Sequence, residues 1–126
     1  MLKGSCLCGS IRFELSENPG APSACHCVQC RKQSGHYFAS VNVSKAAVTI
    51  VGAENLSWYA SSAKVRRGFC AKCGSWLFWE PLARDWTSIA AGAFDGPTQL
   101  QLERHIFVAE KGDYYRIDDG LPQNER

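Results

Sequence analysis

The seven cysteines of this 126-residue chain fall into three close clusters. A C-x-C pair, a C-x-C-x-x-C triplet and a C-x-x-C-G turn contain all of them: Cys6 and Cys8; Cys25, Cys27 and Cys30; Cys70 and Cys73. Such spacings are typical of cysteines that bind metal in a reducing compartment, where structural disulfides are rare. The odd number of thiols points the same way.

The number of thiols predicts two zinc ions per chain, held at sites of different kinds. Zinc takes four ligands in a closed structural site, and three protein ligands with one open position in many catalytic sites. Alternate side chains of an extended segment share a face, so each C-x-C pair can converge on one ion, whereas His26 points away. The partition that uses every thiol places one ion on four cysteines and a second ion, one ligand short, on three: Cys6, Cys8, Cys70 and Cys73; Cys25, Cys27 and Cys30.

Two alternatives to this partition remain open at the level of spacing. A zinc ribbon could join Cys27 and Cys30 to the C-x-x-C turn, although the connection over 31–69 is much longer than the roughly 15–20 residues of the usual spacing. The three-cysteine cluster could also form a closed structural site completed by a histidine, with His36 and His105 as candidates.

Basic residues near the clusters are candidates for binding an anionic substrate. Seven thiolates and two zinc ions would change the formal charge from +2 to −1, so attraction would need a local patch. The candidates are Arg31, Lys32, Arg66 and Arg67, although arginines are more often part of a solvated surface. The aromatic residues are expected mainly in the core, with one or two beside the three-cysteine site.

The elements that must position these residues are mostly strands. Apolar residues alternate over 10–15, 36–43, 47–51, 75–80 and 100–108, and turn sequences such as ENPGAP and FDGP separate the strands. A helical pattern extends only over 28–33, directly after the second cysteine cluster. We therefore expect a mainly β fold of short antiparallel sheets, followed by a loose polar tail at 121–126.

Length and composition favour one domain over residues 1–126 with a core of about 4–123. The small net charge and the absence of a basic stripe disfavour a nucleic-acid partner. No signal peptide or membrane-spanning run is found, so we expect a cytoplasmic protein.

Four segments together resemble the glutathione-dependent formaldehyde-activating enzyme family, which is grouped with the centromere protein V type of zinc domain. These segments are GSCLCGSIRFEL, CHCVQCRKQSG, RGFCAKCGSWLFWE and HIFVAEKGDYYRIDDGLPQ. The resemblance implies the β-tent fold, a structural zinc on the four-cysteine set and a catalytic zinc on the three-cysteine set. The related methionine sulfoxide reductases need a later cysteine, which this chain lacks after Cys73.

The activity implied by the resemblance is that of a zinc-dependent carbon–sulfur lyase or synthase. Its substrate would be an adduct of glutathione or another thiol with formaldehyde or another small aldehyde, as in S-hydroxymethylglutathione. The alternative is a non-enzymatic zinc-binding module for a protein or nucleic-acid partner, as the centromere-type relatives suggest.

Overall fold

Two β-sheets and one short helix make up the chain, and the computed structural model describes residues 1–126. The smaller sheet has the order β1-β2-β5 and is antiparallel throughout. Its strands are β1 (Lys3–Ser5), β2 (Arg12–Leu15) and β5 (Val48–Val51). The larger sheet has the order β10-β3-β4-β9-β8-β7-β6. Its strands are β3 (Ser23–Cys25), β4 (Phe38–Ser44), β6 (Leu56–Ala60), β7 (Val65–Cys70), β8 (Trp76–Pro81), β9 (Trp86–Ala90) and β10 (Arg104–Ile106).

The mainly β class expected from the sequence is confirmed. All sheet pairs are antiparallel except one, because β10 runs parallel to β3. A parallel pair needs a long connection between its strands. Here the two strands are far apart in the chain, and β10, the last strand of the sequence, lies at the edge of the sheet.

The strand expected over 100–108 is wrong in its extent, since β10 contains only Arg104–Ile106. Phe107 has φ 54° and ψ 37°, in the left-handed region that bulky residues rarely adopt. This conformation ends the strand, and a 3-10 turn, η4 (Val108–Glu110), follows it. The alternation of side chains along the sequence therefore stops at Ile106.

The helix α1 (Val28–Ser34) forms where the sequence predicts it. Cys27 is its N-cap, and the Cys27 sulfur accepts a hydrogen bond from the Cys30 N–H. Gly35 ends the helix with φ 84°, and its N–H donates to the Arg31 carbonyl at 2.8 Å. A left-handed glycine is the usual helix stop, so both ends of this short helix are determined locally.

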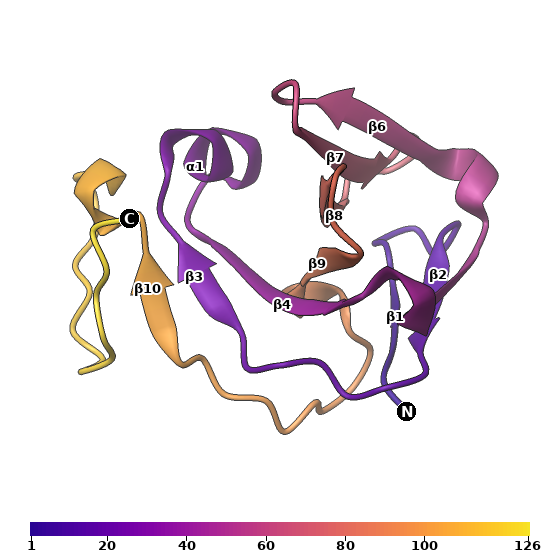
Figure 1. Ribbon diagram of the computed structural model, residues 1–126, viewed down its shortest axis with the longest axis horizontal. Coiled ribbons are helices and arrows are strands. Elements are labelled where there is room, and N and C mark those ends of the chain that lie inside the picture. Colours follow the sequence, from indigo (N-terminus) through magenta and orange to yellow (C-terminus); the bar gives the residue numbers. More distant parts are fainter.

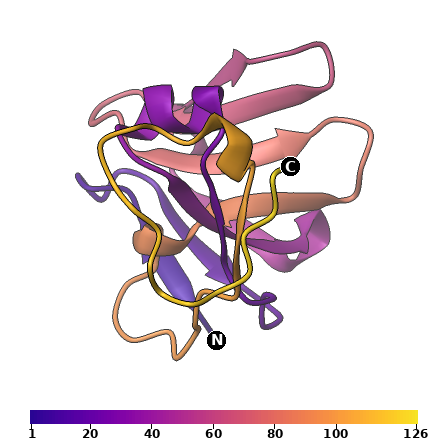
Figure 2. The same cartoon turned by 90° about the vertical axis from the view of Figure 1, so that its left-hand side faces the viewer.

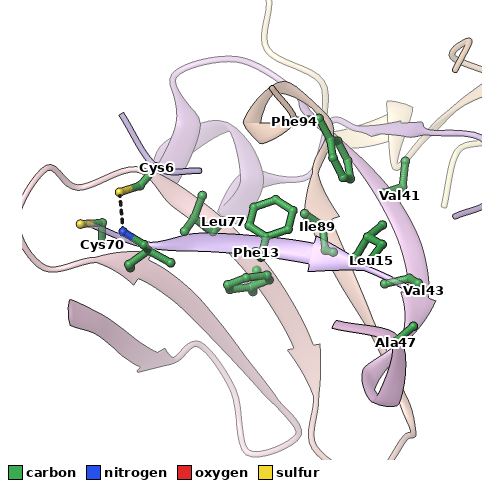
Figure 3. Packing of buried hydrophobic residues seen from close by; sticks show 12 residues of the cluster. Cys6, Phe13, Leu15, Val41, Val43, Ala47, Cys70, Leu77, Ile89 and Phe94 are labelled. Carbon is green, nitrogen blue, oxygen red and sulfur yellow. Dashed lines mark hydrogen bonds between the residues drawn. The ribbon is translucent and has the colours of Figure 1, made fainter. Parts of the chain in front are cut away.

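The main hydrophobic core lies between the two sheets and includes two of the cysteines (Figure 3). Phe13 packs edge-on against Phe78 and Phe94, with ring centroids 5.7 and 5.6 Å apart. Cys6 and Cys70 are buried members of this cluster. Any metal held by these two sulfurs would therefore be continuous with the packing that joins the sheets.

The helix lies beside the concave side of the larger sheet, between β3 and the β6–β7 hairpin (Figure 1). The segment that follows residue 110 forms the outermost layer next to β10. Figure 2 shows it (yellow) facing the viewer. The structure corrects the expectation of a loose tail over 121–126. The His105 N–H donates to Pro122 O at 2.9 Å, and the Asn124 N–H donates to His105 O at 2.8 Å. These bonds satisfy backbone groups at the edge of the sheet.

No helix of this chain has the length and apolar character needed to cross a bilayer. The longest helix is α1, which has seven residues.

Candidate functional site

The first sulfur group joins the N-terminal turn after β1 to the turn between β7 and β8. Its sulfurs all lie within 4.8 Å of one another and belong to Cys6, Cys8, Cys70 and Cys73. Cys8 Sγ lies 3.6 Å from Cys6 Sγ and 3.8 Å from Cys70 Sγ. Tetrahedral zinc with Zn–S bonds of about 2.3 Å requires sulfurs about 3.8 Å apart, so this donor set fits the ion.

Local backbone geometry holds these sulfurs in place. Gly74 adopts φ 79°, and its N–H donates to Cys70 O at 2.8 Å, which closes the C-x-x-C-G turn. The Ile11 N–H donates to Cys6 Sγ at 3.3 Å (dashed line in Figure 3), and the Lys72 N–H donates to Cys70 Sγ at 3.4 Å. Backbone donors of this kind stabilise thiolates and orient them toward a metal.

Ser75, which was not among the residues expected at the site, links the two turns of the four-cysteine group. Its Oγ accepts a hydrogen bond from the Leu7 N–H at 3.0 Å and lies 3.2 Å from Cys73 Sγ. The Ser75 side chain, with its backbone, lowers the pKa of Cys73 to about 5. A thiol followed two residues later by serine is the sequence signal for such a contact.

The second sulfur group lies where β3 passes into α1. Cys25 ends the strand, Cys27 caps the helix and Cys30 lies in its first turn, with the three sulfurs within 4.8 Å of one another. No histidine nitrogen belongs to this group. The structure therefore brings together the four and the three cysteines of the expected partition, and it does not bring together the ribbon set.

Contacts among the three thiols separate their acidities. Hydrogen bonds from Cys25 and then Cys30 lower the pKa of Cys27 to about 2. The pKa of Cys25 is raised to about 11, chiefly by its contact with Cys27. The contacts with Cys25 and Cys27 also raise the pKa of Cys30. The three thiols therefore titrate as one coupled group, in which the hydrogen bonds to Cys27 favour its thiolate.

A cleft with a volume of about 880 Å³ borders the second sulfur group, and all three of its cysteines line the cleft. Ser40 and Asn42 of β4 lie on its floor. Alternate residues of a strand share a face, so these two side chains follow each other along β4 at a spacing of about 6.7 Å. Trp79 and Trp86 also line the cleft, and their rings stack with centroids 5.8 Å apart. The cleft thus extends from the thiols along β4 to an aromatic wall and is large enough for a tripeptide.

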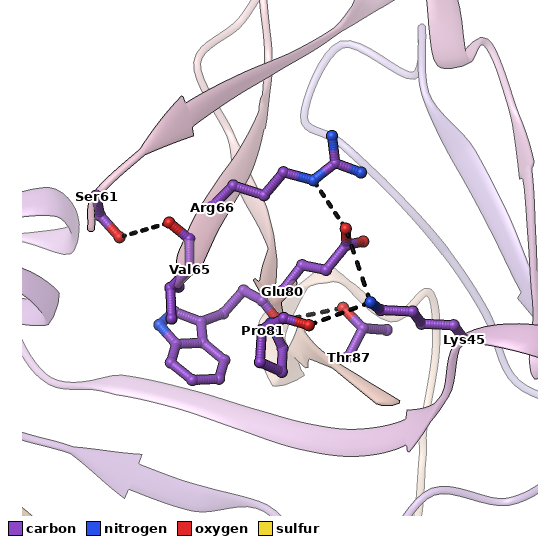
Figure 4. A network of polar contacts seen from close by, with 8 residues as sticks. Lys45, Ser61, Val65, Arg66, Glu80, Pro81 and Thr87 are labelled. Carbon is purple, nitrogen blue, oxygen red and sulfur yellow. Dashed lines mark hydrogen bonds and ion pairs between the residues drawn. The ribbon is translucent and has the colours of Figure 1, made fainter. Parts of the chain in front are cut away.

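The arginines expected near the site divide by position. Arg67 is buried and lines the cleft, whereas Arg31 and Arg66 do not line it. Arg31 Nε donates to the Glu110 carbonyl at 3.3 Å. Arg66 Nε donates to Glu80 Oε1 at 2.8 Å, in a network that Figure 4 shows beside the β7–β8 pair.

Two further basic residues differ in their position relative to the cleft. Lys32 is an exposed residue of α1 that also lies outside the cleft lining. Arg104, which was not among the expected residues, lines the cleft together with its ion-pair partner Glu103, 3.1 Å away. No motif marks Arg104, because only the parallel pairing of β10 with β3 brings it to the cleft.

A chain of four polar side chains occupies the other side of the strand that carries Cys25. Tyr115 OH contacts His26 Nδ1, His26 Nε2 lies 2.8 Å from His105 Nδ1, and His105 Nε2 lies 2.8 Å from Asp119 Oδ2. None of the four lines the cleft. An ionised Asp119 can only accept a hydrogen bond, so with neutral imidazole rings the His105 Nε2–H donates to Asp119 and the His26 Nε2–H donates to His105 Nδ1. The Tyr115 hydroxyl then donates to His26 Nδ1.

These hydrogen bonds engage His105, one of the two candidate histidine ligands, and His26, which the sequence placed facing away from the cysteines. His26 and His105 are 0 and 2% exposed, and both nitrogens of each ring have partners within the chain. Burial, together with the neighbouring His105 ring, lowers the pKa of His26 to about 4. The hydrogen bond from His105 lowers the pKa of Asp119. Neither histidine is therefore free to complete the three-cysteine group.

Two sequence comparisons find relatives over most of the chain. The family profile described as glutathione-dependent formaldehyde-activating enzyme matches residues 1–110. A Halomonas elongata protein, named provisionally as an enzyme of that kind, is 33% identical over 94% of this chain and 82% of its own length. An uncharacterised lyase of Schizosaccharomyces pombe is 27% identical over 90% of this chain and 82% of its own length.

A solved structure shares the fold. The crystal structure of a Rhodobacter sphaeroides protein superposes with a TM-score of 0.62, covering 96% of this chain and 98% of that one. The two sequences are 20% identical, so this likeness concerns the architecture alone.

Proposed function

Because the chain belongs to the glutathione-dependent formaldehyde-activating enzyme family, we propose that it is a zinc-dependent carbon–sulfur lyase or synthase. Its substrate would be an adduct of glutathione, or another thiol, with formaldehyde or another small aldehyde. One observation carries the proposal: Cys25, Cys27 and Cys30 form a group of metal-binding geometry that lines a cleft of about 880 Å³. A small molecule entering this cleft would reach the sulfurs directly.

Two zinc ions per chain are part of the proposal. The four-cysteine group would hold a structural ion, since it offers the full tetrahedral set and includes buried core sulfurs. The three-cysteine group would hold the catalytic ion, and thiolate donors suit zinc there as well. Zinc bound by three thiolates would supply a Lewis acid that lowers the pKa of an incoming thiol and keeps it as the thiolate.

The reaction itself is an addition that needs no oxidant or reductant. In the synthase direction the thiolate sulfur forms a bond to the aldehyde carbon, the carbonyl π electrons move to oxygen, and that oxygen takes a proton from solvent. In the lyase direction the oxygen loses its proton, the C=O bond re-forms and the C–S bond electrons return to sulfur. The protein has to orient the thiol and bring the aldehyde within bonding distance, which is a proximity effect.

The cleft supports binding of a tripeptide thiol. Arg104, which lines the cleft, would bind a carboxylate of glutathione, as the bidentate geometry of a guanidinium favours. The hydroxyl of Ser88 donates to Asn42 Oδ1 at 2.6 Å, which leaves the amide nitrogen of Asn42 as a donor on the cleft floor. Both residues would orient the peptide part of the substrate while its sulfur lies at the cysteines.

Exchange between formaldehyde and S-hydroxymethylglutathione, followed by NMR magnetisation transfer, tests this proposal. We expect faster exchange with the wild-type protein than with Cys27→Ser or with buffer. The buffer measurement is essential because thiols add to formaldehyde unaided. Equal exchange in all three samples would contradict the proposed activity.

A further inference from the structure

Arg67 lies beside the three-cysteine group in a setting unlike that of the other arginines. It is only 4% exposed and projects from β7 toward α1 and the cleft. Its Nη1 lies 3.8 Å from Cys30 Sγ, and its guanidinium carbon lies 4.9 Å from the centre of the Trp76 ring. Trp76 in turn stacks on Phe38, the strand partner of Cys25. The cation is thus packed into the wall of the site.

Neutral groups hold the guanidinium in place. Arg67 Nη2 donates to Gln29 Oε1 at 2.8 Å, and Arg67 Nη1 donates to Gln33 Oε1 at 3.1 Å. The two glutamines are four residues apart in α1 and therefore share a face of the helix. Amide oxygens orient a guanidinium without removing its charge. By contrast, Arg66, the preceding residue of β7, has the carboxylate of Glu80 as its partner.

The charge of Arg67 is left unmatched by any carboxylate. No ion pair includes it, and its Nε is the one buried side-chain nitrogen or oxygen of the chain without a hydrogen-bond partner. A buried charge without a counter-charge is strongly unfavourable. The group that can supply negative charge at contact distance is the thiol cluster, through Cys30. Three thiolates with a divalent ion carry one net negative charge, which one guanidinium balances.

We propose that Arg67 is a positioning residue that serves as the fixed counter-charge of the three-cysteine group and enables this group to accept an anionic thiolate as a further ligand. The inference rests on the proposed function, because it takes the three cysteines as metal ligands. With Arg67 present, an incoming thiolate meets a neutral assembly. Without Arg67, the same thiolate meets an assembly that is already negative and is repelled by it.

Two roles of Arg67 have to be distinguished: balancing the charge of the thiolate sulfurs, and binding a carboxylate of the substrate. If Arg67 balances the charge of the thiolates, it must favour every thiolate to the same extent, including one from a thiol without carboxylates. If Arg67 binds a carboxylate of glutathione, it must leave a thiol such as 2-mercaptoethanol unaffected. Comparison of these two thiols therefore separates the two roles.

The test uses the full chain loaded with Co²⁺, whose absorption bands report the number of thiolate ligands. Glutathione and 2-mercaptoethanol are titrated separately, with metal content measured by elemental analysis and folding checked by circular dichroism. We expect Arg67→Gln to weaken the binding of both thiols about tenfold or more, by similar factors, as for loss of a charge-assisted contact. Arg67→Lys, which keeps the charge, should recover most of the affinity, and the exposed Arg84→Gln should bind as the wild type does.

A second variant keeps Arg67 in place in case Arg67→Gln does not fold. Gln29→Glu changes a neutral acceptor of the guanidinium into a carboxylate of nearly the same shape, so the charge of Arg67 would be matched at the helix. We expect weaker binding of both thiols, whereas Gln101→Glu adds the same charge at an exposed position and should have no effect.

The outcomes separate this inference from the proposed function. Thiol binding that is unchanged in both Arg67→Gln and Gln29→Glu overturns the inference and leaves the proposed function standing. A loss confined to glutathione also overturns it, because that result assigns Arg67 to a carboxylate. A wild-type protein that binds one metal ion, or that binds no thiol, overturns the proposed function and the inference together.

Discussion

Cys8 Sγ lies 3.8 Å from Cys70 Sγ, although 62 positions separate the two cysteines in the chain. This contact joins the N-terminal turn to the β7–β8 turn across the edge of the main core. A metal bound there would link the two sheets through its coordinate bonds to the cysteines. The four-cysteine group should therefore contribute more to the stability of the fold than the three-cysteine group. The latter involves only neighbouring residues of β3 and α1.

This difference predicts unequal stability losses. Cys6→Ser should largely unfold the protein, because structural zinc binding in small domains contributes on the order of 10 kcal/mol or more. Cys27→Ser should cause a clearly smaller loss, since its group does not join distant parts of the chain. Urea unfolding followed by circular dichroism measures both. Equal unfolding of the two variants would mean that both groups are structural.

A chelator should distinguish the two metal ions in the wild-type protein. We expect two zinc ions per chain and a biphasic release, with the ion of the three-cysteine group leaving first. A site with an exchangeable position gives up its metal more readily than a closed site. Release of zinc into a chromogenic chelator is the measurement, and Cys27→Ser should show the slow phase alone. A single phase of two equivalents would contradict the assignment.

Much of this site could be predicted from the cysteine spacing, because alternate residues of a strand and the ends of a C-x-x-C turn constrain their sulfurs locally. The remaining parts depend on long-range pairing. Arg67 reaches Cys30 only because β7 lies opposite α1, and its neighbour Arg66 turns to Glu80. His105 meets His26 only through the parallel pairing of β10 with β3. Neither pairing has a local sequence signal.

The fold, too, has parts that local sequence predicts and parts that it does not. The strand over 10–15 and the helix over 28–33 could be recognised, because their apolar periodicity or flanking caps are local. The three-residue strands β1 and β3 are too short for a period to show. The early end of β10 depends on the left-handed conformation of Phe107, which no feature of that residue type predicts.

The histidine chain predicts a specific stability loss. His105→Leu leaves the Nε2–H of fully buried His26 without an acceptor, which should cost about 1–3 kcal/mol. His36→Leu is the matched control, since His36 is exposed and its ring makes no hydrogen bond, and it should change stability by less than about 0.5 kcal/mol. Denaturant unfolding compares the two. Equal effects would show that the hydrogen bonds among these four side chains contribute nothing to stability.

The pKa of His26 predicts how stability changes with pH. Burial and the His105 ring lower this pKa from 6.5 to about 4, so between these values the unfolded state binds a proton that the folded state does not. Stability must therefore fall as the pH is lowered through that range. The lowered pKa of Asp119 adds a loss in the same direction at more acidic pH.

The control for this pH dependence is His26→Asn, which removes the titrating group and keeps both cysteine groups. Acid release of zinc contributes to both proteins, so only the difference between them reports on His26. We expect the melting temperature of the wild type to fall more steeply between pH 7 and pH 5 than that of the variant. Parallel curves would show that His26 has the same pKa in the folded and unfolded states.

The most direct test of the central claim is zinc X-ray absorption on the wild-type protein with and without glutathione. If one ion has four cysteine ligands and the other has three, the average is about 3.5 sulfurs per zinc at about 2.3 Å. Glutathione should raise this average to about 4, because its sulfur becomes a ligand of the three-cysteine site, and Cys27→Ser should abolish the rise. An average that stays the same when glutathione is added would contradict the account.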